Sequence, residues 1–270
     1  MTPNITFSNK ISRLVQIAPS SQKNHALSKS GRYQRRSFDD FLIGLLSKSC
    51  YFSAGLGDPC KVNDNDCCKN KFGRLVPLII NHLGNPLVIP RLKAGYGKGV
   101  LQLDQTLENV KIEGLNKATV KDSKLDLVAG KLVLFLHANE LKLVTKYNIN
   151  GRCLVVPLWG RGDATITLKN VDLVLDISIG LDNGKINMHG LKIPIKAGSI
   201  HYKFNSLFGE NRKKILTPQF EKVINDNGIL VLNEVLPEYS VQLEKHFGVV
   251  LKPVLAEIPL QAILLLPVLS

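Results

Sequence analysis

The chain has 270 residues, of which 44% are hydrophobic, and a formal net charge of +13 at pH 7. This length and apolar content suffice for a full hydrophobic core, which excludes a disulfide-stabilised miniprotein and a largely disordered chain. One large domain is expected rather than two, because single domains with much β-structure commonly reach about 200–250 residues.

Residues 1–57 differ from the rest in composition. They hold eight Lys or Arg against two Asp, so they carry +6 of the net charge. Apolar periodicity is absent until Phe41, which predicts a poorly ordered basic extension ahead of a domain at 58–270. A short apolar run at 41–46, followed by small residues at 53–55, suggests a degraded signal segment and a mature chain starting near Asp58. The alternative is a basic extension on a protein that is never exported.

The remaining charge of +7 (27 basic minus 20 acidic residues) is spread over the folded part. A solvated surface is the simpler interpretation, and weak attraction to an anionic membrane surface is the alternative. Nucleic-acid binding is disfavoured, because the Lys residues occupy outward strand positions without a cluster of Arg and aromatic residues.

The cysteines are Cys50, Cys60, Cys67, Cys68 and Cys153. The polar segment 58–68 places thiols across a short loop, which favours a local disulfide. A zinc site would need more ligands at closer, paired spacing, and no His lies nearby in the sequence, so no metal is expected. Cys153 lies in an apolar strand, where a buried free thiol is the expected role rather than a nucleophile.

The first predicted element is a helix over 72–83, because apolar residues recur at spacings of three and four before Gly84-Asn85-Pro86. From Val88 to Phe208 apolar and polar residues alternate, which predicts long strands with one apolar face. Asp182-Asn183-Gly184 predicts a hairpin turn, and Arg161-Gly162-Asp163 predicts a glycine turn rather than an integrin-type motif. The expected strands begin at Val88 and continue over 100–107, 110–115, 117–128, 131–137, 140–150, 152–159, 164–179, 186–195 and 199–204.

The apolar period changes after the last strand. A helix is predicted over 216–236, with Gly228 as a point of interruption. A second helical stripe over 241–258 follows Pro237, with Gly248 and Pro253 expected to bend it. The end of the chain, 249–270, contains two charged residues and three prolines, so a buried element is expected there rather than a membrane anchor.

Motifs of catalysis are absent from the sequence: it has no nucleophile elbow, paired-His zinc motif, Walker loop or dinucleotide fingerprint. The six histidines are scattered, and His137 is expected to face solvent. Acidic residues such as Asp172 and Asp176 occupy outward strand positions. No catalytic, cofactor or metal site is therefore expected. A sheet with one apolar face must bury it on helices or on a ligand, which favours a binding protein.

Four stretches carry a family resemblance. They are the two-cysteine segment from Asp58 into helix 72–83, the run YNINGRCLVVPLWGRG at 147–162, the run FNSLFG at 204–209, and the closing helical region 225–237. Their order and spacing over about 58–265 resemble the insect takeout / juvenile-hormone-binding family.

The resemblance implies an α+β, tubular lipid-binding fold in which a long curved antiparallel sheet wraps around a long C-terminal helix and leaves an apolar tunnel. Such proteins are secreted monomeric carriers without a cofactor, and some are clock- or feeding-regulated. Within the resemblance, Cys67 is the expected disulfide partner of Cys60, although Cys68 adjoins it. Cys153 has no later cysteine, so the second disulfide of the moth hormone carriers is missing. The first 57 residues are expected to have no family counterpart.

The leading hypothesis is a secreted carrier that binds a juvenile-hormone-like terpenoid, a fatty acid or an odorant in the tunnel, without catalysis. The residues that contact the ligand cannot be assigned from the sequence. One alternative is a membrane-engaging lipid-transfer protein that uses its basic surface. Another is an extracellular signalling protein with a vestigial tunnel.

Overall fold

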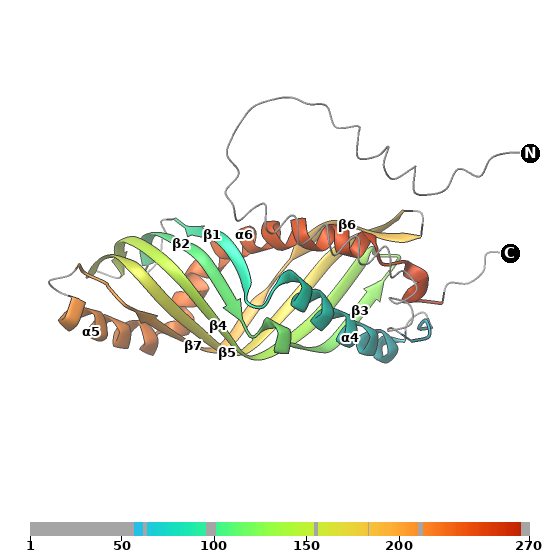
Figure 1. Ribbon diagram of the computed structural model, residues 1–270, viewed down its shortest axis with the longest axis horizontal. Coiled ribbons are helices and arrows are strands. Elements are labelled where there is room, and N and C mark those ends of the chain that lie inside the picture. The colour runs from blue at the N-terminus through green and yellow to red at the C-terminus, as the bar shows by residue number, and fades with distance from the viewer. Residues whose placement is uncertain are drawn as a thin grey trace, which may run out of the picture. The chain divides into compact units, whose positions relative to one another are not determined.

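The structure is a computed structural model that describes residues 57–61, 64–95, 101–153, 156–182, 184–209 and 213–265. All of these lie in one compact unit, 45–270. Residues 1–56, and with them the expected signal segment and Cys50, lie outside the described residues. Figure 1 shows an antiparallel sheet of long, curved strands, with helices packed along it.

Two long strands form the centre of the sheet, β4 (Lys131–Cys153) and β5 (Val156–Asp182). They pair in one unbroken register, from Lys131 opposite Ser178 to Cys153 opposite Val156. Two shorter strands flank each of them. β2 (Leu101–Glu113) and β3 (Thr119–Asp126) lie along β4, whereas β6 (Lys185–Lys192) and β7 (Ile195–Phe204) lie along β5. β1 (Leu87–Ala94) pairs with β2 and forms one edge.

The inward face of each long strand changes phase once. In β4 the buried positions are even-numbered up to Ala138 and odd-numbered from Leu141 onward. In β5 they are even-numbered up to Leu168 and odd-numbered from Val171 onward. Both changes fall opposite each other, at a point where Asn170 has a φ of 51°. A residue in this left-handed region turns the strand, so both halves keep their apolar side chains on the same face.

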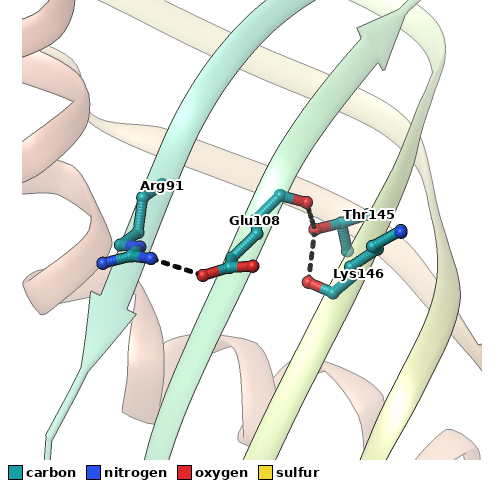
Figure 2. Close-up of polar contacts among 4 residues, drawn as sticks. All are labelled: Arg91, Glu108, Thr145 and Lys146. Carbon is teal, nitrogen blue, oxygen red and sulfur yellow. Dashed lines mark hydrogen bonds and ion pairs between the residues drawn. The ribbon is translucent and has the colours of Figure 1, made fainter. Parts of the chain in front are cut away.

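The buried positions of β2 also change phase, from odd-numbered to even-numbered, and here a β-bulge opposite β4 causes the change. Asn109, with a φ of 51°, and its neighbour Val110 together lie opposite Thr145. The bulge interrupts the regular ladder, and the Thr145 hydroxyl bonds the Glu108 carbonyl at 2.9 Å. Figure 2 shows this contact beside the ion pair of Arg91 with the Glu108 carboxylate, 2.5 Å long, on the outward face.

Several strand boundaries differ from the prediction. β2 runs through the expected break at 108–109, and β7 begins at Ile195, four residues before the predicted start at 199. The expected break at 138–139 is absent, because β4 continues through its phase change. The expected turn at Arg161-Gly162-Asp163 is also wrong, because β5 passes straight through it. The chain instead reverses between Cys153 and Val156, inside the predicted strand 152–159. This segment is apolar and lacks ordinary turn residues, so the reversal had no sequence signal.

The hairpin at Asp182-Asn183-Gly184 was predicted correctly. Asp182 pairs with Lys185 across a two-residue connection, and Gly184 has a φ of 73°. That backbone conformation favours glycine, which explains the strength of the sequence signal.

Helix α4 (Asn65–Leu83) begins seven residues before the predicted start at Phe72 and ends at Gly84 as predicted. Asp64 caps its first turn, since its carboxylate accepts a hydrogen bond from the Cys67 backbone N–H at 2.9 Å. Cys67 and Cys68 therefore lie in the helix and not in a loop.

Two helices follow the sheet, α5 (Lys213–Asp226) and α6 (Gly228–Ala256). The predicted interruption at Gly228 is confirmed, because α6 begins there. A Cβ at Gly228 would lie 2.7 Å from the Ile200 side chain, so the helix start packs directly on β7. The second expected boundary, at Pro237, is wrong: α6 runs through this proline. The bend expected at Gly248 and Pro253 stays a prediction.

Helix α6 spans the two edges of the sheet. It contacts β1 on one side and β6 and β7 on the other. At the first edge Gln242 accepts a hydrogen bond from the Lys93 N–H at 2.9 Å and donates one to the Lys93 carbonyl. Glu238 accepts a bond of 2.5 Å from the Gly95 N–H. These side chains satisfy backbone groups that an edge strand leaves unpaired.

The opposite edge is completed by α5. The Asn225 amide accepts a hydrogen bond from the Tyr202 N–H at 2.6 Å and donates one to the Tyr202 carbonyl at 2.9 Å. The Glu221 carboxylate accepts a bond of 2.5 Å from the Phe204 N–H. Helix side chains thus bond the free backbone groups of β1 and the segment after it, and of β7, at opposite sides of the curved sheet.

After α6 the chain forms a short 3-10 helix (Leu260–Ala262) and packs into the core. Ile258, Leu260, Ile263 and Leu264 are almost fully buried, which confirms the predicted buried element over 258–264, whereas Leu265 is exposed. No helix in the described part of the chain is both long and apolar enough to cross a membrane.

Candidate ligand-binding cavity

A cavity of about 230 Å³ lies between the sheet and the helices. The strands contribute inward-facing side chains, and α6 contributes a stripe whose members are four residues apart: Val231, Val235, Tyr239, Leu243, Phe247, Leu251 and Leu255. This spacing keeps one helix face toward the cavity. The strand and α4 side chains that line it include Phe72, Leu75, Ile79, Leu103, Leu107, Leu134, Leu141, Ile149, Leu158, Ile166, Leu173, Ile177, Ile200, Tyr202 and Phe204.

The cavity lining is almost entirely hydrocarbon. Of the residues that line it in the described part of the chain, none is charged, and only Gln105, Tyr202 and Tyr239 carry polar side-chain atoms. Transfer of an apolar molecule from water into such a space is favourable by about 25 cal/mol per Å². The arrangement can therefore bind an apolar molecule.

The charges lie on the other face of the sheet. Lys131 pairs with Asp176 at 2.7 Å, and His137 contacts Asp172 at 2.7 Å. His137 is absent from the cavity lining, and its partner Asp172 is exposed, so the outward positions predicted for these residues are confirmed. Across the described residues, no group of three or more His, Cys, Asp or Glu could hold a metal ion.

One end of the domain is held together around Cys60. Cys60 and Cys67 form a disulfide, and Cys68 is a buried free thiol. The Cys60 backbone donates to the Ile263 carbonyl at 2.8 Å and accepts from the Leu265 N–H at 2.7 Å. The disulfide joins the first turns of α4 to Cys60, and the backbone bonds of Cys60 connect this point to residues 263–265. Cys153 is the last residue of β4, and its side chain lies outside the described part.

Lys71 reinforces the same end. Its ammonium group donates to the Ala262 carbonyl at 3.2 Å and to the Gly57 carbonyl at 3.0 Å. Desolvation lowers the pKa of this buried lysine, and Asp58 opposes the shift. A buried ammonium group bonded to backbone carbonyls is a structural tie, and Lys71 is not among the cavity-lining residues.

The Arg161-Gly162-Asp163 segment has a structural role. A Cβ at Gly162 would lie 2.1 Å from the Asn205 side-chain oxygen, which accepts a hydrogen bond from the Asp163 N–H at 2.8 Å. The Asn205 amide also donates to the Asp163 carboxylate at 3.2 Å. The triplet thus holds Asn205, in the segment between β7 and α5, against β5.

Sequence reasoning assigned no ligand-contacting residue and missed the three polar groups of the cavity. The patterns that place two of them are visible in the sequence. Tyr202 continues the inward alternation between Ile200 and Phe204. Tyr239 occupies one position of the four-residue stripe on α6. Gln105 lies at an inward position between Leu103 and Leu107, and an amide there has no obvious signal.

Comparison with known proteins gives the family. The family model for Haemolymph juvenile hormone binding protein (JHBP) matches residues 42–265. The chain belongs to the JHBP family. The match begins before residue 58, so the expectation that the first 57 residues have no family counterpart is wrong for residues 42–57.

Two relatives carry the same printed name, circadian clock-controlled protein daywake. The protein from Drosophila melanogaster is 25% identical over 246 residues, covering 80% of this chain and 92% of the relative. The protein from Drosophila yakuba is 26% identical over 179 residues, covering 63% of this chain and 68% of the relative.

A solved structure shares the fold. The crystal structure of Takeout 1 from Epiphyas postvittana matches with a TM-score of 0.67 at 21% identity, covering 78% of this chain and all of that one. The predicted α+β fold, with an antiparallel sheet and a long C-terminal helix, is therefore confirmed. Proteins of the JHBP family bind small hydrophobic ligands, and the apolar cavity agrees with that property.

Proposed function

We propose that this JHBP-family protein is a secreted carrier that holds one small hydrophobic molecule in its internal cavity and performs no chemistry on it. The observation that supports the proposal is the cavity itself, enclosed by α4, the sheet and α6 and lined by hydrocarbon side chains. A ligand that buries about 300 Å² of apolar surface gains about 7.5 kcal/mol before the costs of association are subtracted.

Binding of an environment-sensitive apolar dye tests this proposal. The full chain is titrated with N-phenyl-1-naphthylamine, and the expected result is one saturable site, from which terpenoids and lipids displace the dye. Leu173→Arg, which places a charge in the lining, is expected to abolish binding. Lys169→Ala, on the exposed side of the same strand, is the matched control. Absence of a saturable site in the wild-type protein would contradict the carrier function.

A second candidate, contact with membranes, is favoured by exposed apolar side chains on the helices. Ile215 of α5 and Val241 and Val249 of α6 are each about two-thirds or more exposed. With the net positive charge, they could attract the protein to an anionic lipid surface. Sedimentation with phosphatidylserine vesicles tests this idea. Binding that falls steeply between low and high salt supports membrane contact, and no sedimentation at low salt rejects it.

A further inference from the structure

Helix α5 carries exposed apolar side chains on its outward face. Ile215 is 66% exposed and Val223 is 49% exposed. With Gln219 between them, they follow one another at steps of four residues, which places them in one stripe along the helix. The opposite face packs on the core through its buried residues Thr217, Phe220 and Ile224. The apolar stripe therefore lies in solvent, although another face of the helix already supplies its packing on the core.

Cationic side chains run beside this apolar stripe. Lys214 and Lys222 are exposed and lie eight residues apart, one position before each end of the stripe. Neither lysine forms an ion pair with a described residue. The acidic Glu221 is turned toward the sheet, where it accepts the Phe204 N–H, and the exposed Asp226 is the last residue of the helix. An apolar stripe flanked by lysines is typical of a helix that lies at a membrane surface.

The only tryptophan of the chain lies at the same end of the domain. Trp159 is 39% exposed, and its ring contacts Phe208 edge-on, at 5.7 Å between centroids. Phe208 contacts Phe220 of α5 in the same way, also at 5.7 Å. Arg161 follows Trp159 on the same face of β5 and is also exposed. In the described part of the chain no other aromatic side chain is exposed, and tryptophan is the residue most typical of the boundary between lipid and water.

The outward face of α5 lies close to the cavity. Figure 1 shows α5 at one end of the sheet, along β7. The buried face of this helix contributes Ile224 to the cavity lining, and Phe204, which is bonded to Glu221, also lines it. The exposed stripe is thus separated from the cavity by the thickness of one helix, about 10 Å. A bilayer in contact with the stripe would lie next to this end of the cavity.

We propose that α5, together with Trp159, is the surface through which the protein docks on an anionic lipid membrane. The docking goes beyond the carrier function, and only its use, the exchange of the ligand with the bilayer, rests on that function. It gives the membrane contact considered above a defined location. A lipid surface fits these groups better than an acidic protein, because it accepts aliphatic side chains, an indole ring and unpaired lysines together without a complementary shape.

The test uses the fluorescence of Trp159 in the full chain. Vesicles contain equal parts of phosphatidylcholine and phosphatidylserine, and vesicles of phosphatidylcholine alone are the reference. With the anionic vesicles we expect sedimentation that decreases as salt rises, a shift of the tryptophan emission to shorter wavelength, and quenching by phosphatidylcholine brominated in its acyl chains. Ile215→Ser/Val223→Ser should abolish the quenching, and Lys214→Gln/Lys222→Gln should weaken vesicle binding about thirtyfold.

The matched controls change the same kinds of residue on α6, which offers the competing surface. Val241→Ser/Val249→Ser and Lys245→Gln/Lys252→Gln replace exposed residues of that helix. Both control variants should retain vesicle binding and quenching. All four variants change exposed positions, so each should keep the melting temperature and the dye titration of the wild type.

The outcomes separate docking from carriage. If the α6 variants lose vesicle binding while the α5 variants keep it, or if the protein sediments without quenching of Trp159, docking through α5 is rejected. If the protein does not bind anionic vesicles at low salt, the membrane is rejected as the partner of α5, including the case in which soluble polyglutamate binds there. If the dye has no saturable site while docking occurs, the carrier function fails and the docking surface stands.

Discussion

Gly162 lies in the first third of β5, at a position where the fold leaves no room for a side chain. The space that a Cβ would occupy is taken by the Asn205 side-chain oxygen, 2.1 Å away. Gly162→Ala is expected to destabilise the protein by about 1–3 kcal/mol, because Asn205 must move and its bonds to Asp163 are lost. The change is measured as a shift of the urea midpoint at constant m-value.

The control for this substitution is Gly73→Ala in α4, where an added Cβ meets nothing within 4 Å. Alanine in a helix interior is favoured over glycine by about 1 kcal/mol, so this variant should be as stable as the wild type or more so. A stable Gly162→Ala protein would show that the segment after β7 does not pack against β5 as described.

His246 is expected to make the stability of the protein depend on pH. Burial lowers the pKa of this histidine, so the charged imidazole is disfavoured in the folded state. The unfolded chain then binds more protons below the ordinary histidine pKa of about 6.5, and stability falls as pH decreases through that value. The unfolding midpoint of the wild type is therefore expected to fall between pH 7.5 and 5.5, and His246→Gln should reduce the drop.

The comparison for His246 is His201→Gln, which changes an exposed histidine on β7. It should retain the wild-type pH dependence. An equal drop in stability for the wild type and His246→Gln would mean that this imidazole is not desolvated in the folded protein.

At the scale of elements, the sheet edges depend on helix side chains. Asn225→Ala removes both hydrogen bonds to the Tyr202 backbone, which are 2.6 and 2.9 Å long. Leaving these partly buried groups without a partner is expected to cost about 1–3 kcal/mol. Hydrogen exchange should show faster exchange of the Tyr202 amide. Lys222→Ala, on the exposed side of α5, should change neither stability nor exchange; unchanged exchange in Asn225→Ala would contradict edge closure by α5.

The disulfide joins residues seven positions apart, from Cys60 to Cys67. For so short a loop the entropic contribution is about 2–3 kcal/mol. The double variant Cys60→Ser/Cys67→Ser should be destabilised by about that amount, whereas Cys68→Ser should remain disulfide-bonded. Peptide mapping of the native protein without reduction identifies the bond. A Cys60–Cys68 peptide in its place would contradict the pairing.

The sequence predicted the elements better than their junctions. Alternation identified the inward residues of β5 from Val171 to Ile179, and Asp182-Asn183-Gly184 identified its hairpin. The long strands were divided wrongly because Asn139 and the glycines near Arg161 have the composition of turns. Their strand geometry depends on the pairing of β4 with β5 and on packing of Asn205, which are contacts distant in sequence.

At the scale of the whole molecule, the family and the binding class could be predicted, whereas the grouping of polar side chains in the cavity could not. The four matched stretches occur along the chain in the order that the family has, so the resemblance could be recognised from the sequence. Tyr202 and Tyr239 are 37 positions apart on different elements, and only the packing of α6 against β7 brings them to the same cavity. Sequence alternation shows that each faces inward but not that they meet.

The central claim is that the cavity holds one apolar molecule. Native mass spectrometry of the purified full chain, followed by organic extraction and analysis of the extract, tests it most directly. We expect a mass excess of one small molecule per chain, lost on activation, and a lipid or terpenoid in the extract. The claim would be contradicted if the measured mass equals that of the polypeptide alone, nothing is extracted, and added lipids or terpenoids do not raise the thermal stability.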